Sequence, residues 1–338
     1  MSTAPSPAGT DATTHDERPL VSILLIAYNQ ERLIADAVRG ALAQTWQPLE
    51  IIVSDDASTD GTYAAIEAAL RDYRGPHRVS ARRNEQNEGI TAHLSRLAGL
   101  ARGELLFVAA GDDVSAPERC GRVVEYWLAH EKRFDLIATD LVDIDDTGRV
   151  HERIAPDGLD AYRSFDDWVA RRPHLIGAAH AWSKRLFERF GPMLPGAMAE
   201  DQIMTFRAIV SGGASSLREP LVRYRRGGLS RKRRYRSVDE FVAHKRRSNL
   251  FGLAEVRQLQ HDADIAGLGE RMRAVLAPKL AREAFIERMF AAEGVGARVA
   301  LIARSRDVPA GLKLRMFLYT TCSPIYAPLL WAKRTFGK

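Results

Sequence analysis

The sequence contains little cysteine and no long uninterrupted hydrophobic run. Its two cysteines, Cys120 and Cys322, are far apart and in unlike contexts, which excludes a disulfide framework and a zinc site and fits a reducing cytoplasm. Residues 1–18 have no apolar core of the kind that a cleaved secretory signal needs, so we expect a disordered polar tail and a fold that begins near Pro19. No internal repeat of fixed period is present.

Apolar and charged residues are both plentiful. Of the 338 residues, 46% are hydrophobic and 27% are charged, so the chain is globular and can bury one large core and a smaller accessory region. The formal net charge of +6 suits an anionic partner, and a phosphorylated small molecule, an acidic membrane surface and nucleic acid all meet that condition. Charge alone does not choose among them.

Strand-like and helix-like patterns alternate along the first 130 residues. Four β-prone segments predict strands, at 20–27, 49–54, 78–82 and 104–110. Apolar residues at helical spacing follow these segments, at 28–45, 60–73, 90–101 and after Pro117. This alternation predicts an α/β fold with an open, mostly parallel sheet that is flanked by helices on both faces.

Polar residues follow three of the predicted strands at the point where each strand ends. These groups are Ala27-Tyr28-Asn29, Asp55-Asp56 and Asp112-Asp113. Open α/β sheets bind ligands in the crevice at the carboxyl ends of their strands. We therefore expect the three groups to share one solvent-filled crevice.

The second half of the chain predicts more helices. A strand and a hairpin turn are expected over 134–150, and residues 200–210 predict a helix with Glu200 and Asp201 in its first turn. From Ser237 the pattern is helical to about residue 293, and Ser237 with Glu240 forms a capping box. The divisions that we expect are a polar tail, an α/β domain, a helical region and a C-terminal tail, at 1–18, 19–236, 237–311 and 312–338.

Four motifs together resemble a known family. "VSILLIAYNQERL", "IIVSDDASTDGT", "GDDV" and "EDQIMTFRA" stand in the order typical of the family 2 inverting glycosyltransferases, which include bacterial cellulose, hyaluronan and O-antigen sugar transferases. The resemblance covers roughly residues 19–230 and implies the GT-A fold. It also implies transfer of a sugar from a nucleotide-sugar donor, in particular a UDP-sugar, to a hydroxyl of a glycan or lipid-linked acceptor in cell-surface polysaccharide biosynthesis.

Adjacent carboxylates such as Asp112-Asp113 suit a hard divalent cation that bridges a diphosphate. The resemblance implies that Asp113 is a ligand of Mg²⁺ or Mn²⁺ and that Asp112 contacts the ribose. It also implies that Asp56 hydrogen-bonds the base, in a nucleotide site that includes Ala27, Tyr28 and Asn29. The competing interpretations are an exposed turn or a helix cap ahead of Pro117 for Asp112-Asp113, capping of the following helix for the Asp55-Asp56 segment, and strand-end packing for Tyr28.

The resemblance assigns Asp201 as the general base that takes the proton of the acceptor hydroxyl. At a helix N-terminus, we expect this carboxyl to keep a low pKa. Glu200, His180 and Trp182 fall in the region that would shape the acceptor site. Helix capping for the acidic pair, a structural role for His180 and core packing for Trp182 are the alternatives.

The sequence departs from the family where many members have Tyr-Arg-x-His. Here "VRYRRGGLSRKRRYR" has no histidine, so we expect Arg225 or Arg226 to neutralise the diphosphate instead. Eight of the fourteen residues from Arg223 to Arg236 are basic, but no recognition motif or aromatic platform accompanies them. We therefore expect no nucleic-acid partner.

The last segment, 312–338, is too short and too interrupted in its apolar middle to span a membrane. Its flanking basic residues and its Tyr and Trp residues predict peripheral attachment to the anionic cytoplasmic face of a bacterial inner membrane. The alternative is an apolar hairpin that packs on the protein's own helices.

Other activities fit the same residues less well. A nucleotidyltransferase shares a related fold and acidic metal site, but "IAYNQER" is not the Gly-rich basic loop that it needs after the first strand. An inactive sugar-nucleotide-binding protein would lack the base, whereas Asp201 is present. No G-x-G-x-x-G follows the first strand, which argues against a dinucleotide-dependent oxidoreductase.

Overall fold

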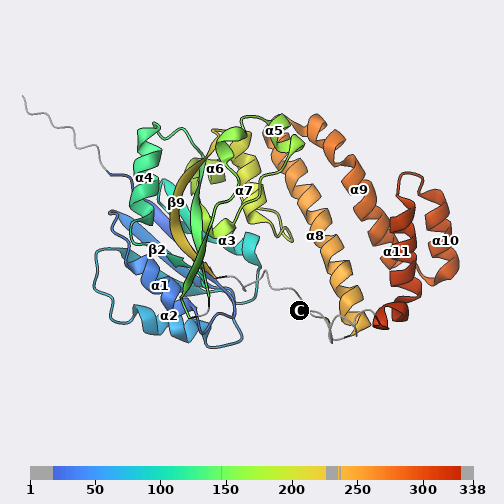
Figure 1. Ribbon diagram of the computed structural model, residues 1–338, viewed down its shortest axis with the longest axis horizontal. Helices are drawn as coiled ribbons and strands as arrows, with labels where there is room; N and C mark the ends of the chain where they lie inside the picture. The colour runs from blue at the N-terminus through green and yellow to red at the C-terminus, as the bar shows by residue number, and fades with distance from the viewer. Residues whose placement is uncertain (1–17, 146, 226–234, 236, 329–338) are drawn as a thin grey trace, which may run out of the picture.

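The structure is a computed structural model that describes residues 18–145, 147–225, 235 and 237–328. A body built on one large sheet lies beside a group of C-terminal helices (Figure 1). The sheet follows the path β3-β2-β1-β4-β8-β6-β9-β5, with β7 paired to β6. The divisions at Ser237 and at residue 312 remain predictions.

The first four strands are parallel to one another. They are β1 (Val21–Ala27), β2 (Leu49–Asp55), β3 (Arg78–Arg83) and β4 (Leu105–Ala110). The β1 side chains alternate between two cores, with Ile23 and Leu25 in one and Leu24 in the other. Both faces of the strand are therefore buried, and its sequence reads as a continuous apolar run.

The rest of the sheet is mixed. Its strands are β5 (Val114–Ser115), β6 (Leu136–Ile144), β7 (Val150–Ile154), β8 (His180–Ser183) and β9 (Ala214–Arg225). β8 runs antiparallel to β4 and β6, β9 runs parallel to β6, and β5 runs antiparallel to β9. The α/β class is confirmed and the β6–β7 hairpin is present; parallel pairing runs from β3 to β4 and joins β6 to β9, and the other described strand pairs are antiparallel.

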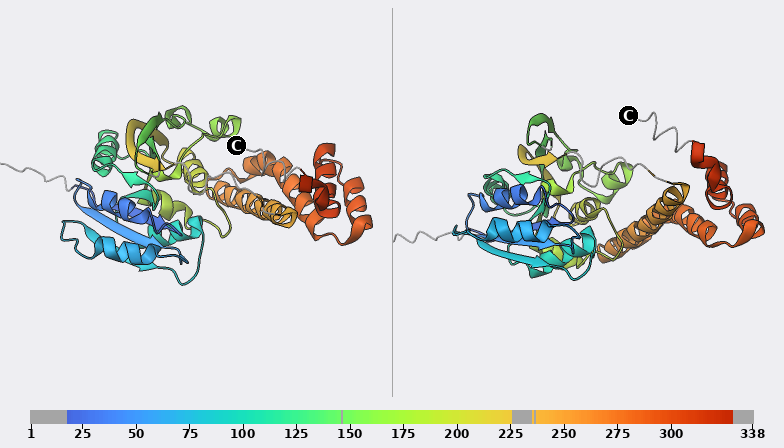
Figure 2. Two further views of the ribbon diagram at one scale, coloured as in Figure 1. Left: turned by 60° about the horizontal axis from the view of Figure 1, so that its bottom comes forward. Right: turned by 90° about the horizontal axis from the view of Figure 1, so that it is seen from below.

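Helices cover both faces of the sheet, as predicted (Figure 2). One face carries α1 (Ile34–Leu42), α2 (Thr62–Leu70) and α4 (Arg119–Ala129). The other carries α3 (Ile90–Leu100), α5 (Phe165–Ala170), α6 (Lys184–Phe190) and α7 (Glu200–Ile209). Two short 3₁₀ segments, η1 (Leu159–Ala161) and η2 (Gly177–Ala179), lie between these elements in sequence.

The C-terminal helices are α8 (Val238–Ile265), α9 (Gly269–Ala291), α10 (Gly294–Arg304) and α11 (Ala310–Thr321), followed by η3 (Ser323–Tyr326). The Ser237 hydroxyl accepts the Glu240 N–H at 3.1 Å, which confirms the predicted start of α8. A fully buried ion pair between Arg207 of α7 and Asp262 joins α8 to the body. The body and the helical region thus share a core.

The segment from residue 312 is partly buried on the protein itself. Met316 is 2% exposed and packs with Phe285 and Met289 of α9, as the alternative interpretation expected. Residues 329–338 lie outside the described part of the chain. Among the residues that the structure describes, no helix is long and apolar enough to cross a membrane.

Candidate active site

The carboxyl ends of β1, β2 and β4 meet at one edge of the sheet. Ala27 pairs with Asp55 in register, and Ile26 pairs with Ala110. The Asp56 N–H donates to the Ala27 carbonyl at 2.9 Å, and the Gly111 N–H donates to the Ile26 carbonyl at 2.9 Å. The predicted convergence of the three polar groups is therefore present in the fold.

Asn29 fixes the loop that follows β2. Its backbone is in the left-handed region, with φ at 52°, and its N–H donates to the Ser58 hydroxyl at 2.9 Å. Its Oδ1 accepts the Thr59 N–H at 2.9 Å. Neighbouring Tyr28 is 44% exposed, so its ring is accessible at the sheet edge. Asn29 positions the edge, and Tyr28 is available to a ligand.

Asp56 is buried among donors of its own chain. Its carboxylate accepts Nδ2 of Asn84 at 2.8 Å and the backbone N–H groups of Glu88 and Gly89, each at 2.9 Å. Only 3% of the residue is exposed. Asp56 therefore tethers the segment after β3, a role that sequence reasoning missed, while contact with a base remains a prediction.

Asp113 does not lie in an open crevice, because β9 covers it. It is 5% exposed, and its Oδ1 accepts the Arg225 N–H at 2.9 Å. Among the described residues, this is the one hydrogen bond that the Asp113 carboxylate accepts. Burial and the adjacent Asp112 carboxylate raise the pKa of Asp113 to about 8. Burial also raises the pKa of Asp112, against hydrogen bonding from Gln30. The expectation of a solvent-filled setting for Asp113 is wrong.

This pair suits a divalent cation by its chemistry. Two carboxylates that are destabilised as anions by burial and by each other would both gain from a bound Mg²⁺ or Mn²⁺. The described part of the chain holds no group of three or more potential metal-ligating His, Cys, Asp or Glu side chains. The remaining ligands would therefore have to come from water and from a bound diphosphate, as is common for Mg²⁺.

Arg225 is committed to the protein rather than free for a diphosphate. Its Nη1 donates to the Asp112 carbonyl at 3.1 Å, and its Nη2 pairs with Asp36 of α1 at 2.9 Å. The residue is 6% exposed, and only its Nε lacks a partner. The guanidinium is therefore engaged by its own chain, and neutralisation of a diphosphate by Arg225 remains a prediction. Arg226 lies outside the described residues.

Arg119 joins the two halves of the site and was not anticipated from the sequence. Its Nη2 donates to the carbonyls of Val108 at 3.0 Å and of Ala178 at 2.8 Å, and its Nη1 donates to the Ser115 hydroxyl at 3.0 Å. Only 1% of the residue is exposed, and burial lowers its pKa to about 10 against the attraction of Asp113. Arg119 thus holds η2 against the strand that leads to the acidic pair.

Glu200 and Asp201 begin α7 beside η2. A Cβ on Gly177 would lie 2.4 Å from Oε1 of Glu200, so only glycine fits there without displacement. Burial and Asp201 raise the pKa of Glu200 to about 8. Burial also raises the pKa of Asp201, although its Oδ1 accepts the Gln202 N–H at 2.7 Å. The predicted low pKa of Asp201 is wrong, because desolvation outweighs the helix terminus.

His180 and Trp182 lie inside the protein on β8. Each is 1% exposed, and Trp182 belongs to the core beneath α6 and α7. Burial and the nearby Arg119 charge lower the pKa of His180 to about 3, so it is neutral. Neither side chain can touch an acceptor in this structure. The structural alternatives hold for both.

Comparison with known proteins gives the class. Residues 22–189 match the family described as "Glycosyl transferase family 2". The succinoglycan biosynthesis protein ExoO of Rhizobium meliloti is 30% identical over 274 residues, which are 73% of this chain and 73% of ExoO. The chain therefore belongs to glycosyl transferase family 2. EpsE of Bacillus subtilis is 30% identical over 138 residues, and the chain spans about half of its length, 49%.

Solved structures agree on the fold. Residues 1–349 of S. aureus TarS, solved in complex with UDP-GlcNAc, superpose with a TM-score of 0.52 at 16% identity, covering 94% of this chain and 88% of that chain. A second TarS structure, in complex with UDP, gives a TM-score of 0.51 at 14% identity over 94% of this chain and 92% of that chain. These likenesses support the GT-A fold.

Proposed function

We propose that the protein transfers a sugar from a nucleotide-sugar donor to an acceptor hydroxyl with inversion. The observation that carries this proposal is the position of Arg119, which attracts Asp113 electrostatically and donates to the Ala178 carbonyl of η2, the segment that lies against Glu200 of α7. It brings a carboxylate pair suited to a metal–diphosphate and a carboxylate suited to a base into one site. Family membership adds that such sites perform sugar transfer.

The chemistry follows from the state of each group. Asp201, with its raised pKa, takes the proton of the acceptor hydroxyl as that oxygen attacks the anomeric carbon. The bond from that carbon to the diphosphate oxygen breaks in the same displacement, so the configuration inverts. A cation on Asp112 and Asp113 would neutralise the departing diphosphate. Arg119 holds η2 close to the end of β4 during the transfer, through its hydrogen bonds to the carbonyls of Val108 and Ala178.

The donor that we propose is a UDP-sugar. TarS binds UDP-GlcNAc and UDP, and the fold is shared. Tyr28 offers an exposed ring beside β1 for stacking on a base. The acceptor that we propose is a glycan or a lipid-linked glycan of a bacterial surface polysaccharide. The relatives named for succinoglycan and teichuronic acid biosynthesis support this choice.

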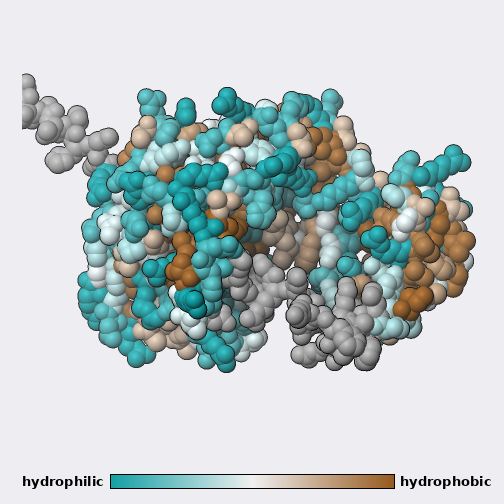
Figure 3. All heavy atoms as spheres, viewed as in Figure 1, coloured by the Kyte–Doolittle hydropathy of each residue, from teal (hydrophilic) through white to brown (hydrophobic). Residues whose placement is uncertain are grey.

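We place the enzyme on the cytoplasmic face of the inner membrane. Among the described residues, α10 buries no side chain, and Val295, Val299, Leu314 and Ile325 are each at least half exposed. Figure 3 shows the resulting apolar patch over α10 and α11. Residues 294–328 contain five basic side chains and one acid, Asp307. An apolar face with a basic surround favours an anionic bilayer surface.

A panel of sugar nucleotides tests the activity. Thermal stabilisation of the native protein by each compound, with and without Mn²⁺, identifies the donor, because a ligand that binds only the folded state raises stability with the logarithm of its excess. We expect stabilisation by at least one UDP-sugar, larger with Mn²⁺ present, and slow metal-dependent hydrolysis of the same compound. Equal stabilisation by every nucleotide sugar, with no metal effect, would contradict the proposal.

A further inference from the structure

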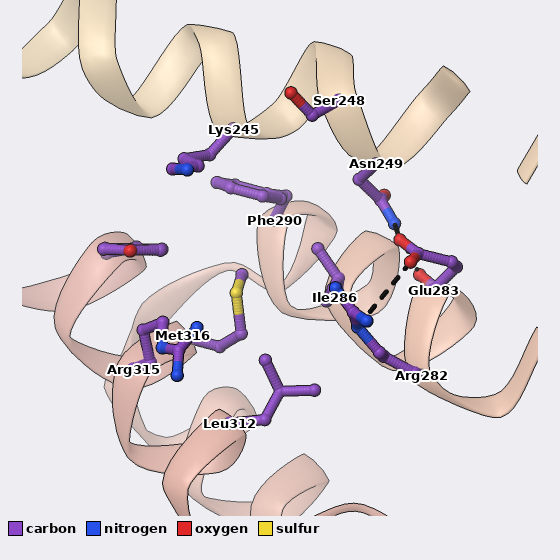
Figure 4. A pocket seen from close by; sticks show the side chains of 11 residues that line it. Lys245, Ser248, Asn249, Arg282, Glu283, Ile286, Phe290, Leu312, Arg315 and Met316 are labelled. Atoms are coloured by element: carbon purple, nitrogen blue, oxygen red, sulfur yellow. Dashed lines mark hydrogen bonds and ion pairs between the residues drawn. The ribbon is translucent and has the colours of Figure 1, made fainter. Parts of the chain in front are cut away.

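A cavity of about 170 Å³ lies between α8, α9 and α11, away from the sheet and from both acidic pairs (Figure 4). One part of its lining is apolar, with Ile286 and Phe290 from α9 and Leu312 and Met316 from α11. A water molecule takes up about 30 Å³ of the liquid, so the cavity has room for a group larger than one or two waters. Sites between packed helices are a common place for small ligands.

Three cationic side chains line this cavity, namely Lys245, Arg282 and Arg315. Arg282 lies 3.7 Å from Glu283, the one acid in the lining, and Glu283 also accepts Nδ2 of Asn249 at 2.7 Å. Among the described residues, neither Lys245 nor Arg315 has an ion-pair partner. The cavity therefore carries two positive charges that no acid of the described chain neutralises.

Charged and apolar side chains line different parts of the cavity. In Figure 4, Lys245 of α8 lies at the upper left and Arg315 of α11 at the lower left, on two sides of the cavity, and the Asn249–Glu283–Arg282 group lies at the right, beyond Phe290 and Met316. Lys245 is also held by a cation–π contact with Phe241, 5.4 Å from the ring centre. Two cations from different helices suit one anion, and the apolar wall beside them suits a hydrocarbon chain attached to it.

We propose that this cavity binds the phosphate head group of an anionic lipid. The two unneutralised cations provide charge-assisted hydrogen bonds to the phosphate oxygens, and the apolar wall contacts the first part of the acyl chain. An inorganic phosphate ion makes only the first set of contacts. The head group of a zwitterionic lipid carries a positive charge of its own. Repulsion between this charge and Lys245 and Arg315 offsets much of the attraction of its phosphate. The site is separate from the donor site and does not depend on the proposed activity.

The test uses the full chain and dihexanoyl phosphatidic acid below its micelle concentration, measured by isothermal titration calorimetry. We expect this lipid to bind, and dihexanoyl phosphatidylcholine and inorganic phosphate to bind at least roughly tenfold more weakly. The double variant Lys245→Gln, Arg315→Gln should lower the affinity for the acidic lipid by at least roughly tenfold, since each charged hydrogen bond contributes appreciably.

The matched control is Arg257→Gln, which removes an exposed cation from the same helix at a position outside the cavity. It should leave the affinity unchanged. Thermal melts test whether each variant is folded. If the double variant is not folded, the single variants Lys245→Gln and Arg315→Gln replace it in the binding measurement. Stabilisation by UDP-GlcNAc on the same samples reports the donor site separately. Equal lipid affinity in the double variant, or phosphate binding as tight as lipid binding, would overturn the proposal.

Discussion

The carboxylates after β2 and those after β4 stand at the same sheet edge, one on each side of β1, but their surroundings differ. Asp56 receives three donors from the segment after β3, and Asp55 is paired with Arg83 at 3.1 Å. Asp113, equally buried, receives one backbone N–H and faces a second carboxylate. A buried anion without sufficient donors is costly. The first pair therefore stabilises the fold, whereas the second is the pair that we propose binds a cation together with the substrate.

The largest effect on the transfer rate should come from substitution of Asp201, the proposed general base. Asp201→Asn keeps an oxygen for the Gln202 N–H but cannot take the acceptor proton, so the transfer rate should fall by roughly 10²–10⁴ while donor affinity is retained. Steady-state kinetics and donor thermal shifts check this. Asp307→Asn, which alters a surface acid of the C-terminal region, should have no effect. A normal rate in Asp201→Asn would return this residue to helix capping alone.

The comparison of the two pairs predicts opposite effects on folding. Asp56→Asn replaces one acceptor oxygen with a donor that faces other donors, so the free energy of unfolding should fall by about 1–3 kcal/mol. Asp113→Asn keeps an acceptor for the Arg225 N–H and removes a carboxyl whose ionisation the fold opposes, so stability should be unchanged or higher. Urea unfolding in metal-free buffer measures both. Equal losses in the free energy of unfolding of the two variants would contradict the contrast between the two acidic pairs.

Glu200 adds a pH dependence of stability. Its folded pKa of about 8 lies above the ordinary value of 4.5, so the native state holds a proton that the unfolded state has released between these pH values. Stability from this group is therefore present at low pH and is lost as pH rises toward 8. Glutamine does not titrate, so the melting temperature of the wild type should fall relative to that of Glu200→Gln as pH rises across that range. A separation that does not change with pH would contradict this account.

The smallest effect concerns the exposed apolar patch on α10 and α11. Leu314→Asp should weaken sedimentation with phosphatidylglycerol vesicles by roughly threefold to tenfold, because it places a charge where a 62% exposed leucine would enter the interface. Leu100→Asp, at a 54% exposed position on α3, is the control. An equal loss of vesicle sedimentation in Leu314→Asp and Leu100→Asp would argue against membrane binding by the patch.

Local patterns in the sequence predicted much of this fold. The apolar runs of β1, β2 and β4 and the Ser237 cap depend on neighbouring residues, and the structure confirms them. β8 has only four residues, and its strand state depends on pairing with β4 and β6. Its periodicity is therefore too short to detect.

The state of the site residues depends on contacts far apart in the chain. Asp113 is buried because Arg225, 112 positions later, closes over it. In the sequence, Arg119 is an ordinary helix arginine. Its role depends on its hydrogen bond to the carbonyl of Ala178, 59 positions later. Asp201 has a raised pKa because the chain packs around α7, although its helix position alone predicts the reverse. No local pattern reports such contacts.

The most direct test of the account is metal-dependent binding of UDP, titrated calorimetrically with and without Mn²⁺. In the wild type, Mn²⁺ should tighten UDP binding by at least roughly tenfold. Asp113→Asn should abolish this gain without loss of folding, and Asp56→Asn should retain the gain in the fraction that stays folded. A full gain from Mn²⁺ in Asp113→Asn would contradict the claim that the carboxylates after β4, unlike those after β2, are kept for a cation.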